Sequence, residues 1–70
     1  MKIIDLHGIR HEDVQNFFWQ NCKDFEAPFI VITGNSDRMK KIVFLVADNL
    51  GLSVRNHIDN PGRLIVYESN

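Results

Sequence analysis

The stretch Phe29-Ile30-Val31-Ile32-Thr33-Gly34-Asn35-Ser36-Asp37 decides the fold of this chain. Residues 29–33 form a short, continuous apolar run, which is typical of a strand that is central in a sheet or buried on both faces. Residues 34–37 are turn-forming and helix-capping types, so the chain changes at once from strand to helix. We therefore expect a central strand over residues 29–33 and a helix that begins near Asp37.

Upstream of this stretch, the sequence predicts another strand and another helix. Residues 2–6 indicate a short strand that is closed by His7-Gly8. From about His11 the apolar residues recur at helical spacing, and Pro28 is expected to end that helix. The apolar stripe of this first helix consists of Val14, Phe17, Phe18, Cys22 and Phe25.

Downstream, one helix and two strands complete the pattern. The second helix is expected over residues 37–50, and its core face consists of Met39, Ile42, Val43, Val46, Ala47 and Leu50. Residues 53–58 alternate, which predicts a strand with Val54 and Ile58 on one side. A turn at Asn60-Pro61-Gly62 leads into the last strand, residues 64–67.

The order of these elements predicts the topology. Each strand–helix–strand unit is expected to be a right-handed crossover, which makes the first two strands parallel. If both crossovers step in the same direction, both helices cover one face of the sheet, and the closing hairpin makes the last strand antiparallel. We therefore predict that residues 1–70 form a single domain of the α+β class. It is a two-layer β-α-β-α-β-β sandwich with a four-stranded mixed sheet of order 1-2-4-3, whose other face is uncovered.

Composition excludes several classes of protein. In 70 residues, 44% are hydrophobic, which excludes disorder, and no apolar run is long enough for a membrane span. The single cysteine, Cys22, cannot form an internal disulfide, and an acid interrupts the apolar N-terminal stretch, so we expect a cytoplasmic protein without a signal peptide. The net charge of −1 means that any binding of nucleic acid must depend on a local basic patch.

Two segments are expected to meet beyond the carboxyl ends of the first two strands, where ligands bind in open parallel sheets. In Asp5-Leu6-His7-Gly8, the side chains of Asp5 and His7 lie two residues apart and point to the same face. A carboxylate can fix the tautomer of an imidazole and raise its basicity, so these two residues are candidate catalytic groups. The alternative is a structural role, in which Asp5 accepts a hydrogen bond from the backbone of a nearby loop.

The second segment predicts an anion site. The amides that follow Gly34 lie at the start of a helix, which favours phosphate. The candidate phosphate-binding or nucleic-acid-binding residues are Gly8, Thr33, Gly34, Asn35, Ser36, Arg38, Lys40 and Lys41, the last three being the only dense basic cluster in the chain. In the alternative interpretation, Ser36 or Asp37 caps the helix and the basic residues form a solvated surface.

These motifs resemble the Smr (small MutS-related) domain family over essentially the whole chain. The resemblance is carried by Asp5-Leu6-His7-Gly8, by Ile32-Thr33-Gly34, and by Asn60-Pro61-Gly62 with the strand that follows it. It implies nucleic-acid binding, with DNA nicking or RNA cleavage in some members, and a DNA or RNA partner that is structured. No cofactor is required by the sequence, and magnesium is compatible with such a site; no metal ligands are assigned.

Three positions depart from the family pattern. Ser36 stands where the second glycine of a T-G-x-G loop belongs, the short loop lacks the family's additional histidine, and Arg10 stands in place of a Thr or Ser helix cap. The first departure weakens the case for close approach of a phosphate, and the second removes a candidate catalytic group.

Two other functions stay open. The chain can be a non-catalytic nucleic-acid-binding module, or a protein-interaction domain that acts through the helix flanks of Trp19 and Phe44, in a homodimer or with a partner. Both side chains lie more than about 90° from the centre of their own apolar stripe. Arg55 and His57 are expected on the uncovered face, where they either follow a nucleic-acid backbone or keep an edge strand soluble.

Overall fold

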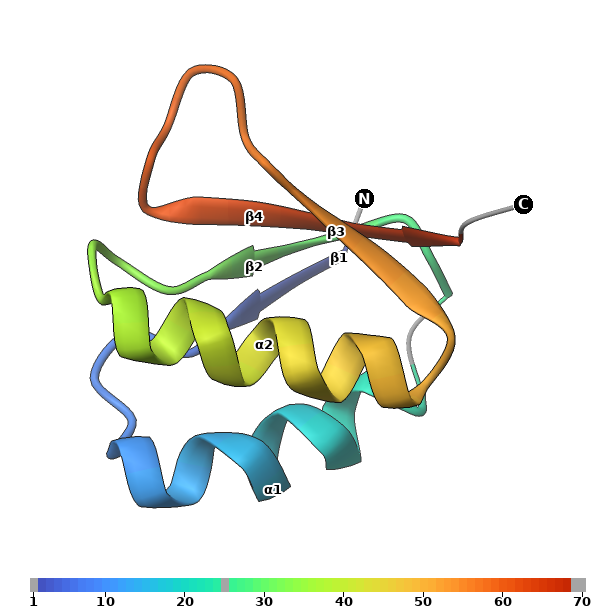
Figure 1. Cartoon of the computed structure of the whole chain (residues 1–70), viewed down its shortest axis with the longest axis horizontal. Helices are drawn as coiled ribbons and strands as arrows, with labels where there is room; N and C mark the ends of the chain where they lie inside the picture. The colour runs from blue at the N-terminus through green and yellow to red at the C-terminus, as the bar shows by residue number, and fades with distance from the viewer. Residues whose placement is uncertain (1, 25, 69–70) are drawn as a thin grey trace.

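A computed structural model describes residues 2–24 and 26–68 and contains six elements in the predicted order (Figure 1). They are β1 (Lys2–Asp5), α1 (His11–Cys22), β2 (Phe29–Ile32), α2 (Asp37–Asn49), β3 (Leu52–Asn56) and β4 (Arg63–Glu68). The sheet order is β1-β2-β4-β3, with β1 and β2 parallel and the other two pairs antiparallel. The predicted α+β sandwich with strand order 1-2-4-3 is therefore confirmed.

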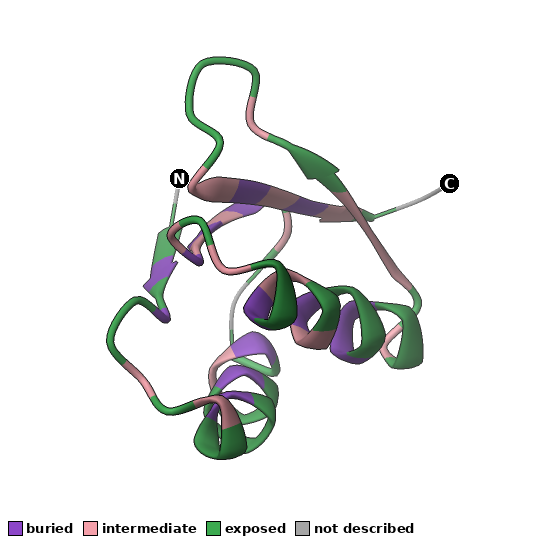
Figure 2. Cartoon of the chain, turned by 60° about the vertical axis from the view of Figure 1, so that its left-hand side comes forward, coloured by how far each residue is buried: buried purple, intermediate pink, exposed green. Residues whose placement is uncertain are grey.

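One hydrophobic layer lies between the sheet and the two helices, which cover the same face (Figures 1 and 2). In β2 and β4 the buried residues alternate with half-buried ones, because successive strand residues point to opposite faces. The largest fully buried side chains are Phe18, Phe29, Leu6, Leu64, Val14, Val31, Val43, Val46 and Val66. Within the described chain, no helix covers the opposite face, and no helix is long and apolar enough to cross a membrane.

The first helix is shorter than the sequence pattern predicts. It ends at Cys22, well before Pro28, because the chain must return from the helix layer to the start of β2. Phe17 is 41% exposed, so its expected place in the core is wrong: it lies on the flank of α1, away from the stripe of Val14, Phe18 and Cys22. Phe25 lies outside the described residues.

The third strand also ends early. β3 stops at Asn56, and Ile58 is 85% exposed in the loop that follows, so the predicted placement of Ile58 beside Val54 is wrong. The last pairing with β4 is Asn56 with Leu64, after which the His57 amide donates to the Arg63 carbonyl oxygen. Beyond that contact the chain enters the hairpin loop, where it pairs with no strand, so alternate side chains no longer point to opposite faces of the sheet.

Candidate functional site

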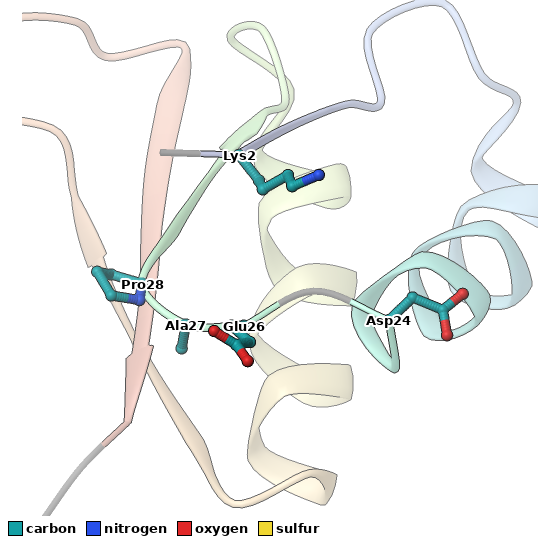
Figure 3. Close-up of a pocket in the computed structure, with 5 residues that line it drawn as sticks. All are labelled: Lys2, Asp24, Glu26, Ala27 and Pro28. Carbon is teal, nitrogen blue, oxygen red and sulfur yellow. The ribbon is translucent and has the colours of Figure 1, made fainter.

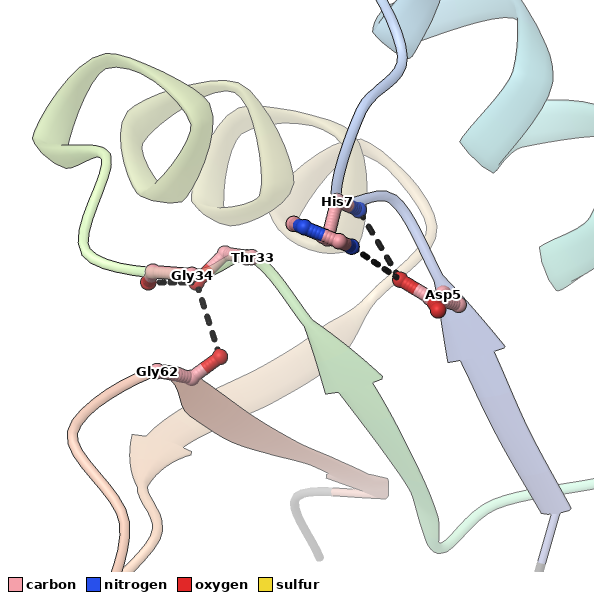
Figure 4. Close-up of polar contacts among 5 residues, drawn as sticks. All are labelled: Asp5, His7, Thr33, Gly34 and Gly62. Carbon is pink, nitrogen blue, oxygen red and sulfur yellow. Dashed lines mark hydrogen bonds and ion pairs between the residues drawn. The ribbon is translucent and has the colours of Figure 1, made fainter.

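Three loops that are distant in sequence meet at one edge of the sheet. They follow β1, β2 and β3, and all lie at the left-hand end of Figure 1. The carbonyl oxygen of Gly62 accepts hydrogen bonds from the amides of Thr33 (2.9 Å) and Gly34 (3.0 Å). The Thr33 hydroxyl also donates to this oxygen, at 3.4 Å (Figure 4). A Cβ atom on Gly62 would lie only 3.3 Å from the Cα atom of Gly34, so the two backbones are in close contact. The β3–β4 hairpin is thus fixed against the carboxyl end of β2.

These loops enclose an open pocket of about 430 Å³, which we call the edge pocket. It is lined by His7, Ile32, Gly34, Asn35, Asn60, Pro61, Gly62 and Arg63. Arg63 pairs with Ile32 in the sheet, and both residues belong to the half-buried set that faces away from the helices. The edge pocket therefore opens onto the uncovered face.

Asp5 and His7 lie on the same side of the chain, as predicted, and both side chains are mostly exposed. One carboxylate oxygen of Asp5 (Oδ1) accepts a hydrogen bond from the His7 amide at 3.0 Å and lies 3.9 Å from Nδ1 of the His7 ring (Figure 4). Asp5 therefore has a structural contact, although the amide that it accepts belongs to the turn after its own strand and not to the neighbouring loop. At 3.9 Å, Nδ1 and the carboxylate form an ion pair when the ring is protonated. Nδ1 is thus the ring nitrogen on the side of Asp5.

The side chains of two predicted phosphate-binding residues are used within the protein. Thr33 is buried, and its hydroxyl donates to the Gly34 carbonyl oxygen at 2.9 Å. Ser36 caps α2, because its Oγ accepts a hydrogen bond from the Met39 amide at 3.1 Å. Among the described residues, the amides of residues 35–38 have no protein acceptor, so an anion can still bind at this helix start.

The loop has an imidazole neighbour that the sequence pattern did not reveal. His11, from the first turn of α1, lies with Nε2 3.1 Å from Oγ of Ser36. The family's additional loop histidine is absent from the sequence, yet an imidazole from another element reaches the same loop. Helical periodicity places His11 only on its own helix and cannot show this contact.

Arg63 is the most important lining residue that the sequence analysis did not select. It follows Gly62 directly and is the first residue of β4. Its position directly after the hairpin turn is the feature of the sequence that could have identified it. By contrast, the basic cluster of Arg38, Lys40 and Lys41 does not line the edge pocket, and neither does Gly8, whose positive φ of 89° serves a turn. Among the residues that line the edge pocket, Arg63 is thus the one arginine, and there is no lysine.

A second depression, of about 560 Å³, lies at the opposite end of the parallel strands (Figure 3). It is lined by Lys2, Asp24, Glu26, Ala27 and Pro28. Its charged side chains are two acids and one base, and it contains none of the predicted site residues.

Within residues 2–24 and 26–68, no three His, Cys, Asp or Glu side chains come together as a possible metal site.

Comparison with known proteins adds no relative: no family model, curated protein or solved structure matches the chain.

Proposed function

We propose that this chain is a nucleic-acid-binding domain of the Smr type that holds a backbone phosphate in the edge pocket. The observation that supports the proposal best is the pocket itself, in which His7 and Asn35 come from two separate loops and Arg63 comes from the start of β4. A guanidinium, an amide side chain and an imidazole together suit a phosphodiester, because all can donate hydrogen bonds to its oxygens.

The phosphate would be held from two directions. Arg63 offers a planar fork of N–H donors that matches two phosphate oxygens. The free amides of residues 35–38 lie at the start of α2, where the helix dipole favours an anion. The carboxylate of Asp37 in that first turn opposes the anion, so Arg63 carries more of the binding in this proposal.

Binding is tested by Arg63→Gln, with Arg10→Gln as the matched control on an exposed side chain that does not line the pocket. We expect Arg63→Gln to weaken binding to oligonucleotides and to reduce the salt dependence, log K against log salt, by about one unit. The readout is fluorescence anisotropy over a series of salt concentrations. Equal effects of the two substitutions would contradict a phosphate contact at Arg63.

Cleavage is a second candidate function, favoured by the exposed ring of His7 on the pocket wall. In this mechanism Asp5 orients the ring through Nδ1, and Nε2 accepts the proton of an attacking water or 2′-hydroxyl. The attacking oxygen forms a bond to phosphorus while the P–O bond to the leaving oxygen breaks. The leaving oxygen then takes a proton from water or from the imidazolium, and Arg63 stabilises the charge on the phosphoryl oxygens.

Cleavage is tested on supercoiled DNA and on single-stranded RNA, with and without magnesium. The expected result is a cleavage rate that falls by about 100-fold or more in His7→Ala, in the range of general acid–base catalysis. A His7→Ala protein that cleaves as fast as the parent would remove His7 from the mechanism. Binding without cleavage by the parent would leave the non-catalytic module as the function.

A protein-interaction function is favoured by a separate observation on the helices. Trp19 on α1 is 38% exposed and Phe44 on α2 is 44% exposed, and neither residue lines the edge pocket. If these flanks bind a second copy or a partner, Trp19→Ala dissociates the complex in analytical ultracentrifugation. A parent that is monomeric at high concentration would exclude the homodimer.

A further inference from the structure

The face of the sheet that no described helix covers carries an ordered set of apolar side chains. Strand alternation and register place Ile3, Ile30, Ile32, Ile65, Tyr67, Ser53, Arg55 and Arg63 on this face. One cross-strand row runs from Ile3 through Ile30 and Ile65 to Arg55. The centre of the face is therefore aliphatic, and its side at β3 is cationic.

The charges on this face favour an anionic ligand. Arg55 lies on the edge strand β3 and Arg63 begins β4, so two guanidinium groups border the apolar centre. The acid on the same face is Asp5, on the edge strand β1, in the same cross-strand row as Ile32 and Arg63; its carboxylate already accepts the His7 amide. The face is also continuous with the edge pocket, because Ile32 and Arg63 belong to both.

We propose that this uncovered face binds single-stranded nucleic acid, which enters the edge pocket with one of its phosphates. This inference rests on the proposed function and names its substrate class. Bases lie against Tyr67 and the isoleucines, while Arg55 and Arg63 contact the backbone. An open four-stranded sheet can stack two or three unpaired bases, whereas a duplex keeps its base faces inside the stack.

The dimensions of the face fit such a ligand. Arg63 and Tyr67 are four residues apart on β4, which corresponds to roughly 13 Å at the rise of an antiparallel strand. The ring of Tyr67 thus lies at one end of the face and the edge pocket at the other. A second copy packed face to face would bury the guanidinium groups of Arg55 and Arg63 against few acids, which is costly.

The experiment compares fluorescein-labelled single strands of about 12 nucleotides, of DNA and RNA, with a duplex of equal length. Arg55→Glu is compared with Lys23→Glu, which makes the same change in net charge on an exposed residue of the helix layer. We expect Arg55→Glu to lower the affinity for single strands about tenfold or more, and Lys23→Glu to change it by no more than about twofold. Circular dichroism confirms that both variants are folded.

A second pair of variants separates stacking from folding. Tyr67→Leu keeps an apolar side chain on β4 but removes the aromatic ring, and Tyr67→Phe keeps the ring. We expect about a tenfold loss of affinity for Tyr67→Leu and near-parental binding for Tyr67→Phe, since stacking on an aromatic ring contributes strongly for each base.

The outcomes distinguish the two proposals. If the parent binds oligonucleotides but prefers the duplex, or if Arg55→Glu and Lys23→Glu act equally, the inference about this face is wrong and the proposed function stands. If the parent binds no oligonucleotide, both are wrong. A parent dimer that Arg55→Glu dissociates and that single strands do not would assign the face to a second copy.

Discussion

The carbonyl oxygen of Gly62 accepts two successive amides, and this small contact determines the shape of the edge pocket. Because the amides of Thr33 and Gly34 are both used there, neither can bind a ligand. In the proposed site, the loop amides that are left for an anion are therefore those of residues 35–38. The same contact brings Arg63, the next residue in the chain, to the mouth of the pocket.

Gly62→Ala is expected to destabilise the protein by about 1–3 kcal/mol, the usual cost of overpacking. Its Cβ would lie 3.3 Å from the Cα atom of Gly34 and 3.4 Å from Oδ1 of Asn60. The backbone of Gly34 cannot retreat without stretching its own hydrogen bond to Gly62. Urea denaturation measures the effect, with Pro61→Ala as a control in the same exposed loop. A Gly62→Ala protein as stable as that control would show that the two loops can separate freely.

Cys22 gives the stability of the protein a dependence on alkaline pH. Burial raises the pKa of its thiol above the usual 9.0, because the thiolate is poorly solvated in the core. The unfolded chain therefore loses this proton at a lower pH than the folded one. The contribution of the thiol to the free energy of unfolding is fully present below its pKa in the unfolded chain. It is lost as the pH rises through its pKa in the folded protein, by at most about 1.4 kcal/mol per pH unit.

The corresponding measurement compares the free energy of unfolding at about pH 8 and about pH 10 in the parent and in Cys22→Ala. We expect the parent to lose more stability than the variant over this interval, since the two proteins differ only in the thiol. Native Cys22 should also react slowly with iodoacetamide at the lower pH. Rapid alkylation of the folded protein would contradict the buried position of the thiol.

At the scale of elements, the two helices begin differently. α2 has Ser36 as a capping residue, and His11 supports that cap from α1. α1 begins after Arg10, whose backbone is extended but whose side chain makes no capping hydrogen bond and lies 3.7 Å from Glu12 at the surface. At the N-cap position of α1 the backbone therefore has the usual extended conformation, but no side chain accepts a hydrogen bond from the first turn.

Arg10→Ser is expected to stabilise the protein by about 0.5–1 kcal/mol, because a serine hydroxyl can accept an amide of the first turn. Arg10→Ala removes the same arginine without providing the acceptor and serves as the control. Thermal denaturation of both variants measures the difference. If the serine variant is no more stable than the alanine variant, the first turn of α1 does not benefit from a cap.

The order of elements could be predicted from the sequence, while their ends could not. Two right-handed crossovers and one hairpin leave few arrangements of four strands, so periodicity and chain direction were sufficient. Where α1 ends depends on the position of β2, and whether Ile58 is part of a strand depends on where pairing with β4 stops. Both are tertiary properties. The closeness of Asp5 and His7 could be predicted, because the two residues are only two apart at the end of one strand. Arg63 was missed because its position depends on a contact between the hairpin and β2.

At the scale of the whole molecule, a small core makes each buried aromatic ring indispensable. Phe29 is fully buried at the start of β2 and meets Phe18 edge to face, with ring centroids 6.4 Å apart. Phe44 belongs to the same chemical type but is 44% exposed on a flank of α2. The two phenylalanines therefore form a matched pair, in which one substitution tests the core and the other tests the surface.

Phe29→Ala is expected to cost about 3–5 kcal/mol, the usual loss for a buried phenylalanine. A chain of this length has a total stability of roughly 4–10 kcal/mol, so the variant is close to unfolding or unfolded at ambient temperature. Phe44→Ala should cost less than about 1 kcal/mol and leave the fold intact. Urea denaturation followed by far-ultraviolet circular dichroism measures both. If Phe44→Ala were as damaging as Phe29→Ala, the flank of α2 would have to be covered in solution, which would favour a second copy or another contact at that surface over a free one.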